Sequence, residues 1–301
     1  HNYYPDFLWR NETKETIAGN VVEKGVAVQR AKYSHDLFVD EAVRFVERNK
    51  SRPFFLYLAL TIPHANNEAG KKGMETPSDE PYSREAWPEA QRNHAAMITR
   101  LDRDVGRLLD KLRELGIDEE TIVIFTSDNG PHQEGGADPA FFNSSGGLRG
   151  FKRSLHEGGV RVPTIVRWPG QVKAGDVNAH VWAFWDFLPT ACELAGTKSP
   201  EELDGVSIVP TLLGRGGQKK HEFLYWEFHE GGSKQAVRMG DWKAVRNAPG
   251  GKLELYDLSR DLGEKSEVAA DHVDVVRRIE EYLKTARTES EQWPLRAKKG
   301  K

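Results

Sequence analysis

The feature that most constrains the fold is the run at residues 121–130, which reads TIVIFTSDNG. An apolar run of this kind is typical of a strand that is buried on both faces, as in a parallel sheet. Open α/β sheets bind their ligands just beyond the carboxyl ends of the strands. Asp128 and Asn129 occupy that position, so we expect them in a functional site. The alternative is an ordinary strand-end turn, because Asp, Asn and Gly all favour turns.

The same two side chains indicate which kind of ligand such a site would hold. Asp128 and Asn129 can offer a cation oxygen atoms only. Oxygen ligands suit a hard ion such as Ca2+ or Mg2+ far better than zinc.

Two further segments carry polar residues next to apolar runs. Residues 53–60 read PFFLYLAL, which predicts a second buried strand, and His64 follows it. Residues 150–163 read GFKRSLHEGGVRVP; they carry Lys152 and lead into a third apolar run at 164–168. The three segments together supply an acid and amide pair, a histidine and a lysine.

The organisation of the chain indicates an α/β unit followed by a small α+β unit. Apolar residues recur at helical spacing over 35–48 and 98–115, and Gly116 is the expected C-terminal cap. Glycine and charge accumulate after residue 213, which predicts domains at 1–214 and 215–301. The remaining expected elements are a surface loop at 66–90, helices at 186–194 and 271–286, and strands at 222–228, 236–239, 241–246 and 253–258.

Composition excludes several classes of function. The formal net charge of -3 leaves no basic excess for nucleic acid. No stretch reaches the roughly 18 apolar residues that a membrane helix needs. No signal peptide opens the given sequence, which says nothing about location if the chain is a fragment. The single cysteine, Cys192, excludes an internal disulfide framework, and we expect it to be a small buried apolar residue.

Taken in order, these motifs resemble the sulfatase family, the formylglycine-dependent members of the alkaline phosphatase superfamily. The likeness covers the PFFLYLAL run leading into Pro63-His64, the helix around 98–106, the SDNG turn and the GFKRSLHEGGVRVP segment. It continues through Trp242-Lys243 and the LYDL run at 255–258. The resemblance implies an alkaline phosphatase-like mixed sheet sandwiched by helices, with a small C-terminal antiparallel sheet and helix.

The chain departs from the family pattern in one respect. Sulfatases carry their nucleophile in a Cys-x-Pro-Ser-Arg or Ser-type motif near the mature N-terminus, with two metal-binding aspartates before it. This sequence has neither, and no Pro-Ser-Arg follows Cys192. We therefore expect the chain to correspond to the C-terminal two-thirds of a sulfatase. The formylglycine would be in a preceding segment, and the chain alone would be inactive.

The resemblance also implies roles for four residues. Asp128 and Asn129 match the family's metal-binding pair, with Ca2+ the expected ion and Mg2+ second. Asn129 argues against a two-zinc site, which would favour histidine there. Lys152 matches the lysine that contacts the sulfate and its bridging oxygen. His64 matches the histidine that faces the sulfate and the leaving group.

Neighbouring polar residues are assigned supporting roles. We expect Glu157 and Arg161 to shape the Lys152 loop and to pair locally. For His132 and His156 we expect a place at the rim of the pocket or a local hydrogen bond.

Three hypotheses about function stay open at this stage. The first is a sulfuric ester hydrolase acting on a sulfated carbohydrate or an aryl sulfate, and family resemblance implies that it is exported. The second is a phosphate or phosphonate ester hydrolase of the same superfamily. The third is a noncatalytic binding protein that retains the pocket without the nucleophile. The coding sequence upstream of residue 1 discriminates between the enzymes and the binding protein.

Overall fold

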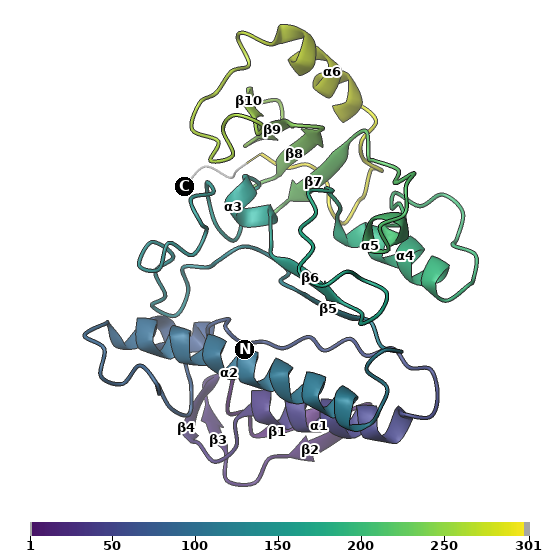
Figure 1. Cartoon of the computed structure of the whole chain (residues 1–301). Helices are drawn as coiled ribbons and strands as arrows, with labels where there is room; N and C mark the ends of the chain where they lie inside the picture. Colours follow the sequence, from purple (N-terminus) through teal and green to yellow (C-terminus); the bar gives the residue numbers. More distant parts are fainter. Residues whose placement is uncertain (1, 298–301) are drawn as a thin grey trace. The chain divides into compact units, whose positions relative to one another are not determined.

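The computed structural model describes residues 2–297 (Figure 1). The chain divides into two compact units. The first comprises the residues up to Thr121 together with His132–Phe142. The second comprises Ile122–Pro131 together with the chain from Asn143 onward. The predicted domain boundary at 214/215 stays a prediction.

The first unit is built on two long helices, α1 (Ser34–Asn49) and α2 (Glu89–Glu114). Both helices were predicted, although α2 begins nine residues earlier than its apolar stripe indicated, directly after Pro88. Gly116 has φ of 71°, as expected for the residue that ends a helix in the left-handed conformation. Short elements complete the unit: β1 (Phe7–Arg10), β2 (Thr13–Thr16), β3 (Val21–Glu23), β4 (Val26–Gln29) and the 3-10 helix η1 (Asn67–Lys72).

The core of the first unit is rich in tyrosine and methionine. Tyr3, Tyr33, Met74 and Met97 are each at most 3% exposed, and they pack together in one cluster. Met74 lies in the stretch that was expected to be a surface loop. Although the stretch has no periodicity, it contributes to the core, because individual apolar residues of a loop can be buried without repeating at regular intervals.

The expected buried strand at 53–60 is not formed. The segment is extended, but it pairs with no strand among the described residues, and its side chains alternate between half-buried and exposed. Phe55 and Tyr57 are 69% and 81% exposed. A strand requires a hydrogen-bonded neighbour as well as an apolar sequence, and the described residues supply none.

The second unit opens with β5 (Val123–Thr126), the strand that ends in the SDNG turn. It pairs with β6 (Thr164–Arg167) in antiparallel register, with Phe125 opposite Ile165. Its four residues are half-buried, and Ile165 is 62% exposed. The strand itself was predicted correctly. The prediction that it is buried on both faces, as in a parallel sheet, was wrong. An apolar sequence does not specify the direction of its partner strand.

The C-terminal part of the second unit is a four-stranded antiparallel sheet covered by a helix. The strands are β7 (Leu224–Phe228), β8 (Lys234–Met239), β9 (Trp242–Arg246) and β10 (Leu253–Asp257), in the order β10-β9-β8-β7. Helix α6 (Val273–Leu283) packs Ile279 and Leu283 onto this sheet. All five elements were predicted, because each alternates or repeats its apolar residues and pairs with a sequence neighbour.

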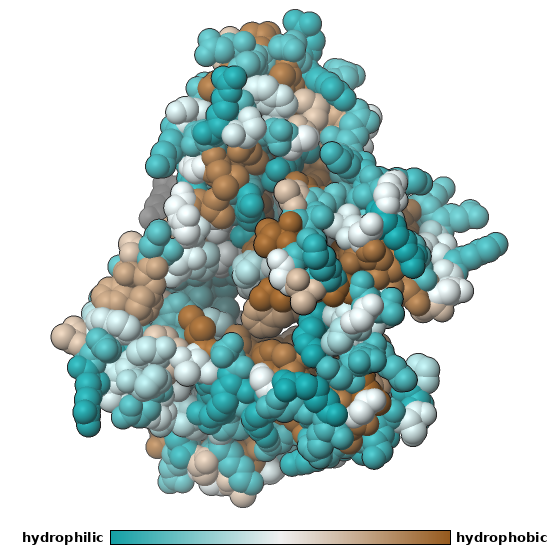
Figure 2. All heavy atoms as spheres, viewed as in Figure 1, coloured by the Kyte–Doolittle hydropathy of each residue, from teal (hydrophilic) through white to brown (hydrophobic). Residues whose placement is uncertain are grey.

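Short helices lie between β5 and β7 along the chain. They are α3 (Glu157–Val160), η2 (Phe184–Asp186), α4 (Phe187–Leu194) and α5 (Val209–Leu212). Helix α4 confirms the prediction for 186–194. Figure 2 shows a mostly hydrophilic face with several separate apolar groups. Within residues 2–297, no helix combines the length and the apolar character that crossing a bilayer requires.

Candidate functional site

The SDNG turn and the Lys152 loop are interlocked by their backbones. The amide of Gly130 donates to the carbonyl of Gly159 over 3.0 Å, and the amide of Lys152 donates to the carbonyl of Pro131 over 2.8 Å. A Cβ atom at Gly130 would lie 1.8 Å from the carbonyl oxygen of Gly158. Only glycine permits this approach. The fold therefore fixes Asp128, Asn129 and the backbone of Lys152 in one part of the second unit.

The side chains of the turn keep oxygen atoms available for a cation. Asp128 is exposed, and its carboxylate has no hydrogen-bond or ion-pair partner among the described residues. Asn129 donates from Nδ2 to the carbonyl of Gly130 over 2.9 Å, which orients the amide and leaves its oxygen without a donor from the described chain. These two side-chain oxygens fit a hard divalent ion such as Ca2+, which takes six to eight oxygen ligands. Further ligands have to come from elsewhere.

A buried ion pair anchors the far end of the Lys152 loop. Glu157 begins helix α3, and its Oε1 lies 2.9 Å from Nζ of Lys243, the second residue of β9, which is 0% exposed. Arg161 also pairs with Glu157, over 3.8 Å, which confirms the expected local contact. Lys243 is the closer partner, and sequence reasoning missed it. The available signal was a lysine inside a short strand, next to Trp242 and two small or apolar residues.

A second buried carboxylate lies beside this pair. Oε2 of Glu264 accepts from the amide of Glu157 over 2.6 Å, and Glu264 is 0% exposed. Its other oxygen, Oε1, has no partner within residues 2–297. Burial raises the pKa of Glu264 to about 7. This side chain is therefore a carboxyl group that can hold a proton near neutral pH.

His64 lies in the first unit and is surrounded by hydrogen-bonding groups of that unit. Its Nδ1 is 2.7 Å from the carbonyl oxygen of Ala65, and its Nε2 is 3.2 Å from Oε2 of Glu134. The ring stacks on His132, with centroids 5.5 Å apart. His132 contacts the carbonyl of Pro63 through Nε2 over 3.0 Å, which agrees with the local hydrogen-bond role considered for it. Sequence reasoning did not single out Glu134.

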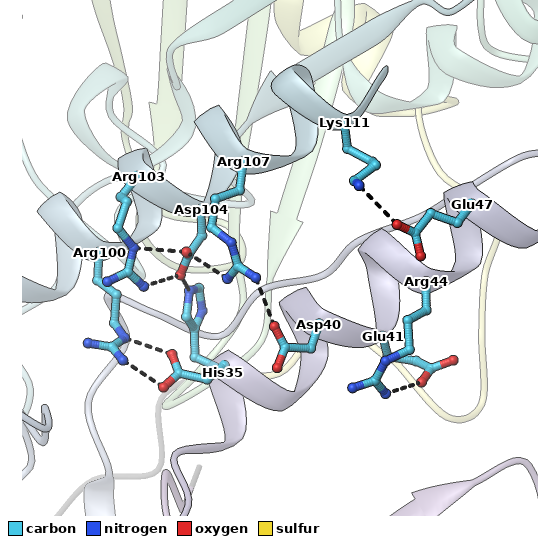
Figure 3. A network of polar contacts seen from close by, with 11 residues as sticks. His35, Asp40, Glu41, Arg44, Glu47, Arg100, Arg103, Asp104, Arg107 and Lys111 are labelled. Carbon is cyan, nitrogen blue, oxygen red and sulfur yellow. Dashed lines mark hydrogen bonds and ion pairs between the residues drawn. The ribbon is translucent and has the colours of Figure 1, made fainter. Parts of the chain in front are cut away.

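One cluster in the first unit has the composition of a metal site. His35 and Asp36 of α1 and Asp104 of α2 place three ligand atoms within 4.8 Å of one another. Figure 3 shows that Arg103 and Arg107 of α2 contact the carboxylate of Asp104. Arg100 donates to both oxygens of Asp36 over 2.7 and 2.6 Å. Asp104 is bound by two more arginines and by His35, namely by Arg103 over 2.8 Å, Arg107 over 3.2 Å and His35 over 3.0 Å.

This arrangement favours a structural role for the cluster. Three guanidinium groups already neutralise its two carboxylates, and a divalent cation would be repelled by them at close range. Burial lowers the pKa of His35, which keeps the imidazole neutral beside Asp104. The network joins α1 to α2, and we do not assign a metal ion to it.

The fold is that of the alkaline phosphatase-like proteins. The crystal structure of Ps i-CgsB superposes with a TM-score of 0.71 at 31% identity, over 86% of this chain and 56% of that one. The crystal structure of a putative sulfatase, yidJ, from Bacteroides fragilis matches with a TM-score of 0.67 at 20% identity, over 94% of this chain and 63% of that one.

Sequence comparison identifies the family within this fold. The family model Sulfatase matches residues 1–197, and the model N-sulphoglucosamine sulphohydrolase, C-terminal, matches residues 148–289. The chain belongs to the sulfatase family. It is similar to steryl-sulfatase of Mus musculus, with 36% identity over 69% of this chain and 32% of that protein. It is also similar to N-acetylgalactosamine-6-O-sulfatase of Bacteroides thetaiotaomicron, with 31% identity over 84% of this chain and 51% of that protein. The chain thus spans about a third of the first of these curated relatives and about half of the second.

Proposed function

We propose that the complete protein containing this chain is a sulfuric ester hydrolase that cleaves a sulfate monoester of a carbohydrate. The observation that carries the proposal is the SDNG turn, which is locked through Gly130 onto the loop that carries Lys152, in a chain of the sulfatase family. Family membership indicates the class of reaction. The turn supplies oxygen ligands for a metal ion. The loop locked onto it supplies the positively charged side chain of Lys152.

The metal assignment rests on the ligands that the turn presents. Asp128 and Asn129 would hold Ca2+ through oxygen, with Mg2+ as the second choice, because Mg2+ demands a more regular octahedral set. When bound, the ion neutralises negative charge on the esterified sulfate. The other ligands and the formylglycine nucleophile would come from a segment outside this chain.

The side chains of this chain have complementary tasks in the proposed reaction. The ammonium group of Lys152 offers a compact positive charge to the sulfate and its bridging oxygen. The imidazole of His64 offers a hydrogen bond to the leaving oxygen. When the bond from sulfur to that oxygen breaks, His64 gives it a proton, so that the leaving group departs as an alcohol.

Two relatives support a carbohydrate substrate. The Bacteroides thetaiotaomicron relative is described as an N-acetylgalactosamine-6-O-sulfatase. Ps i-CgsB, which matches over 86% of this chain, was crystallised in complex with k-i-k-neocarrahexaose. An aryl sulfate is the alternative substrate, because human arylsulfatase A is 31% identical over 80% of this chain. Resemblance to exported family members extends the proposal to export of the complete protein.

A comparison of matched esters tests the proposal. The complete gene product is assayed with sulfated saccharides, an aryl sulfate and the aryl phosphate of the same leaving group. We expect sulfate release to exceed phosphate release, and the upstream coding sequence to contain Cys-x-Pro-Ser-Arg. Preferential phosphate release would favour the phosphate or phosphonate ester hydrolase instead. No turnover of any ester would favour the noncatalytic binding protein.

A further inference from the structure

The contacts of His64 determine where its protons are. The carbonyl oxygen of Ala65 can only accept a hydrogen bond, so Nδ1 of His64, 2.7 Å away, carries a proton. On a neutral ring, Nε2 would then turn its lone pair toward Oε2 of Glu134, 3.2 Å away. Attraction requires a proton between these two atoms. Because imidazole is a stronger base than carboxylate, that proton resides on the ring, and His64 is an imidazolium.

The contacts of His132 lead to the opposite protonation state. Its Nε2 lies 3.0 Å from the carbonyl oxygen of Pro63, so Nε2 carries a proton. Its Nδ1 accepts a hydrogen bond from the backbone amide of Glu134 over 3.1 Å, so Nδ1 carries none. A second proton on His132 would break this bond. His132 is therefore held in the neutral Nε2-H form.

These contacts form a closed loop around His64. His132 binds the carbonyl of Pro63, the residue before His64, and it also fixes the backbone of Glu134. The carboxylate of Glu134 returns to the ring of His64. The hydroxyl of Tyr3 donates to the carbonyl of His64 and holds its backbone from another side.

Burial strengthens this arrangement. The side chains of His64 and Glu134 are only 19% and 17% exposed, so water screens their attraction less than it would at an open surface. The ring of His132 stacks on His64 at an interplanar angle of 24° and so covers one face of the His64 ring. The ring centroids of His94 and His132 lie 5.7 Å apart. Burial lowers the pKa of His94 to about 4, so His94 adds no competing charge at neutral pH.

We propose that Glu134 is a positioning residue that keeps His64 in its doubly protonated form, and that His132 aims Glu134 at it. This assigns a role to the His-x-Glu sequence at 132–134, which follows the SDNG turn by one residue. The inference deepens the proposed sulfatase function and rests on it for its catalytic meaning. The imidazolium carries two protons: Nδ1 keeps the one bound to the carbonyl of Ala65, and the Nε2 proton, held by Glu134 before the ester binds, is the one that passes to the leaving oxygen.

The protonation states can be observed directly in the full chain. Long-range 1H–15N spectra of 15N-histidine protein at pH 7.5 distinguish an imidazolium from either neutral form. We expect His64 to be doubly protonated in the natural sequence and neutral, with the proton on Nδ1, in Glu134→Gln. Gln133→Ala changes an exposed neighbour and is expected to leave His64 charged. Retained dispersion of the backbone amide signals in every variant shows that the fold is kept. A neutral His64 in the natural sequence would overturn the proposal.

An activity measurement on the complete gene product separates this inference from the proposed function. Glu134→Gln should lower kcat for a sulfate ester by about ten-fold or more, because protonation of the leaving oxygen matters in the transition state. KM should change by less than about two-fold, and Gln133→Ala should leave both constants unchanged. A charged His64 in an inactive complete protein refutes the sulfatase function and leaves the pairing intact. An active protein with unchanged kcat in Glu134→Gln refutes the positioning role.

Discussion

Replacement of Glu264 by glutamine should remove a pH dependence from the stability of the protein. Glu264 is 0% exposed, and its Oε1 has no partner within the described chain. Burial raises its pKa from 4.5 to about 7. Because the folded state favours the protonated form, the group stabilises the fold below its unfolded pKa. That stabilisation is lost as pH rises through 7.

The size of the effect follows from the shift. The change from 4.5 to about 7, at about 1.4 kcal/mol per pH unit, amounts to about 3.5 kcal/mol, and most of it falls between pH 5 and pH 8. Glutamine is neutral at every pH, and its side-chain oxygen can still accept from the amide of Glu157. The free energy of unfolding of Glu264→Gln, relative to the natural sequence, should therefore rise by about 2 to 3 kcal/mol from pH 5 to pH 8.

Urea denaturation followed by tryptophan fluorescence measures this difference at each pH. Other titrating groups are common to both proteins, so they cancel in the comparison. Glu291→Gln is the matched control, because Glu291 is exposed and has no described partner. Its curve should run parallel to that of the natural sequence. If the Glu264→Gln curve is parallel as well, Glu264 titrates as it would in water and the reasoning is wrong.

Three further substitutions test the site and its supports. Lys243→Met leaves the carboxylate of Glu157 buried without its main partner and should cost about 3–5 kcal/mol by urea denaturation; a loss below about 1 kcal/mol would contradict the anchoring role. Gly130→Ala forces the turn away from the loop, so it should cost about 1–3 kcal/mol of stability and lower metal affinity. The control Gly106→Ala should be tolerated, because its Cβ atom meets nothing within 4 Å. Equal stability of the two variants would contradict the interlock. Lys152→Ala in the complete gene product should lower kcat about 100-fold or more at an unchanged denaturation midpoint, and a modest effect would make Lys152 an ordinary surface residue.

The sequence predicted the elements whose stability is local. Helices α1 and α2 follow from apolar spacing, and the sheet from β7 to β10 follows from alternating strands joined by tight turns. The failures concern elements that depend on distant partners. Residues 53–60 have the composition of a buried strand, but pairing depends on neighbours that the described residues do not supply. The direction of β5 depends on β6, which follows it by about 40 residues and whose orientation no local pattern specifies.

The same distinction applies to the candidate site. The resemblance placed Asp128, Asn129, Lys152 and His64 through motifs that are contiguous in sequence. The supporting contacts join residues far apart, which a single sequence does not reveal. His64 and Glu134 meet across 70 positions, and Glu157 meets Lys243 across 86. The structure gives His132 and Glu134 partners around His64, which the motifs alone did not indicate.

The calcium content of the complete gene product tests the central claim most directly. The oxygen atoms of Asp128 and Asn129 should hold one hard divalent ion, so the purified protein should contain about one calcium per chain by elemental analysis. Asp128→Ala should lose it, while Asp176→Ala, which changes an exposed aspartate of the same unit, should retain it. Full calcium occupancy and normal sulfate release in Asp128→Ala would contradict the account.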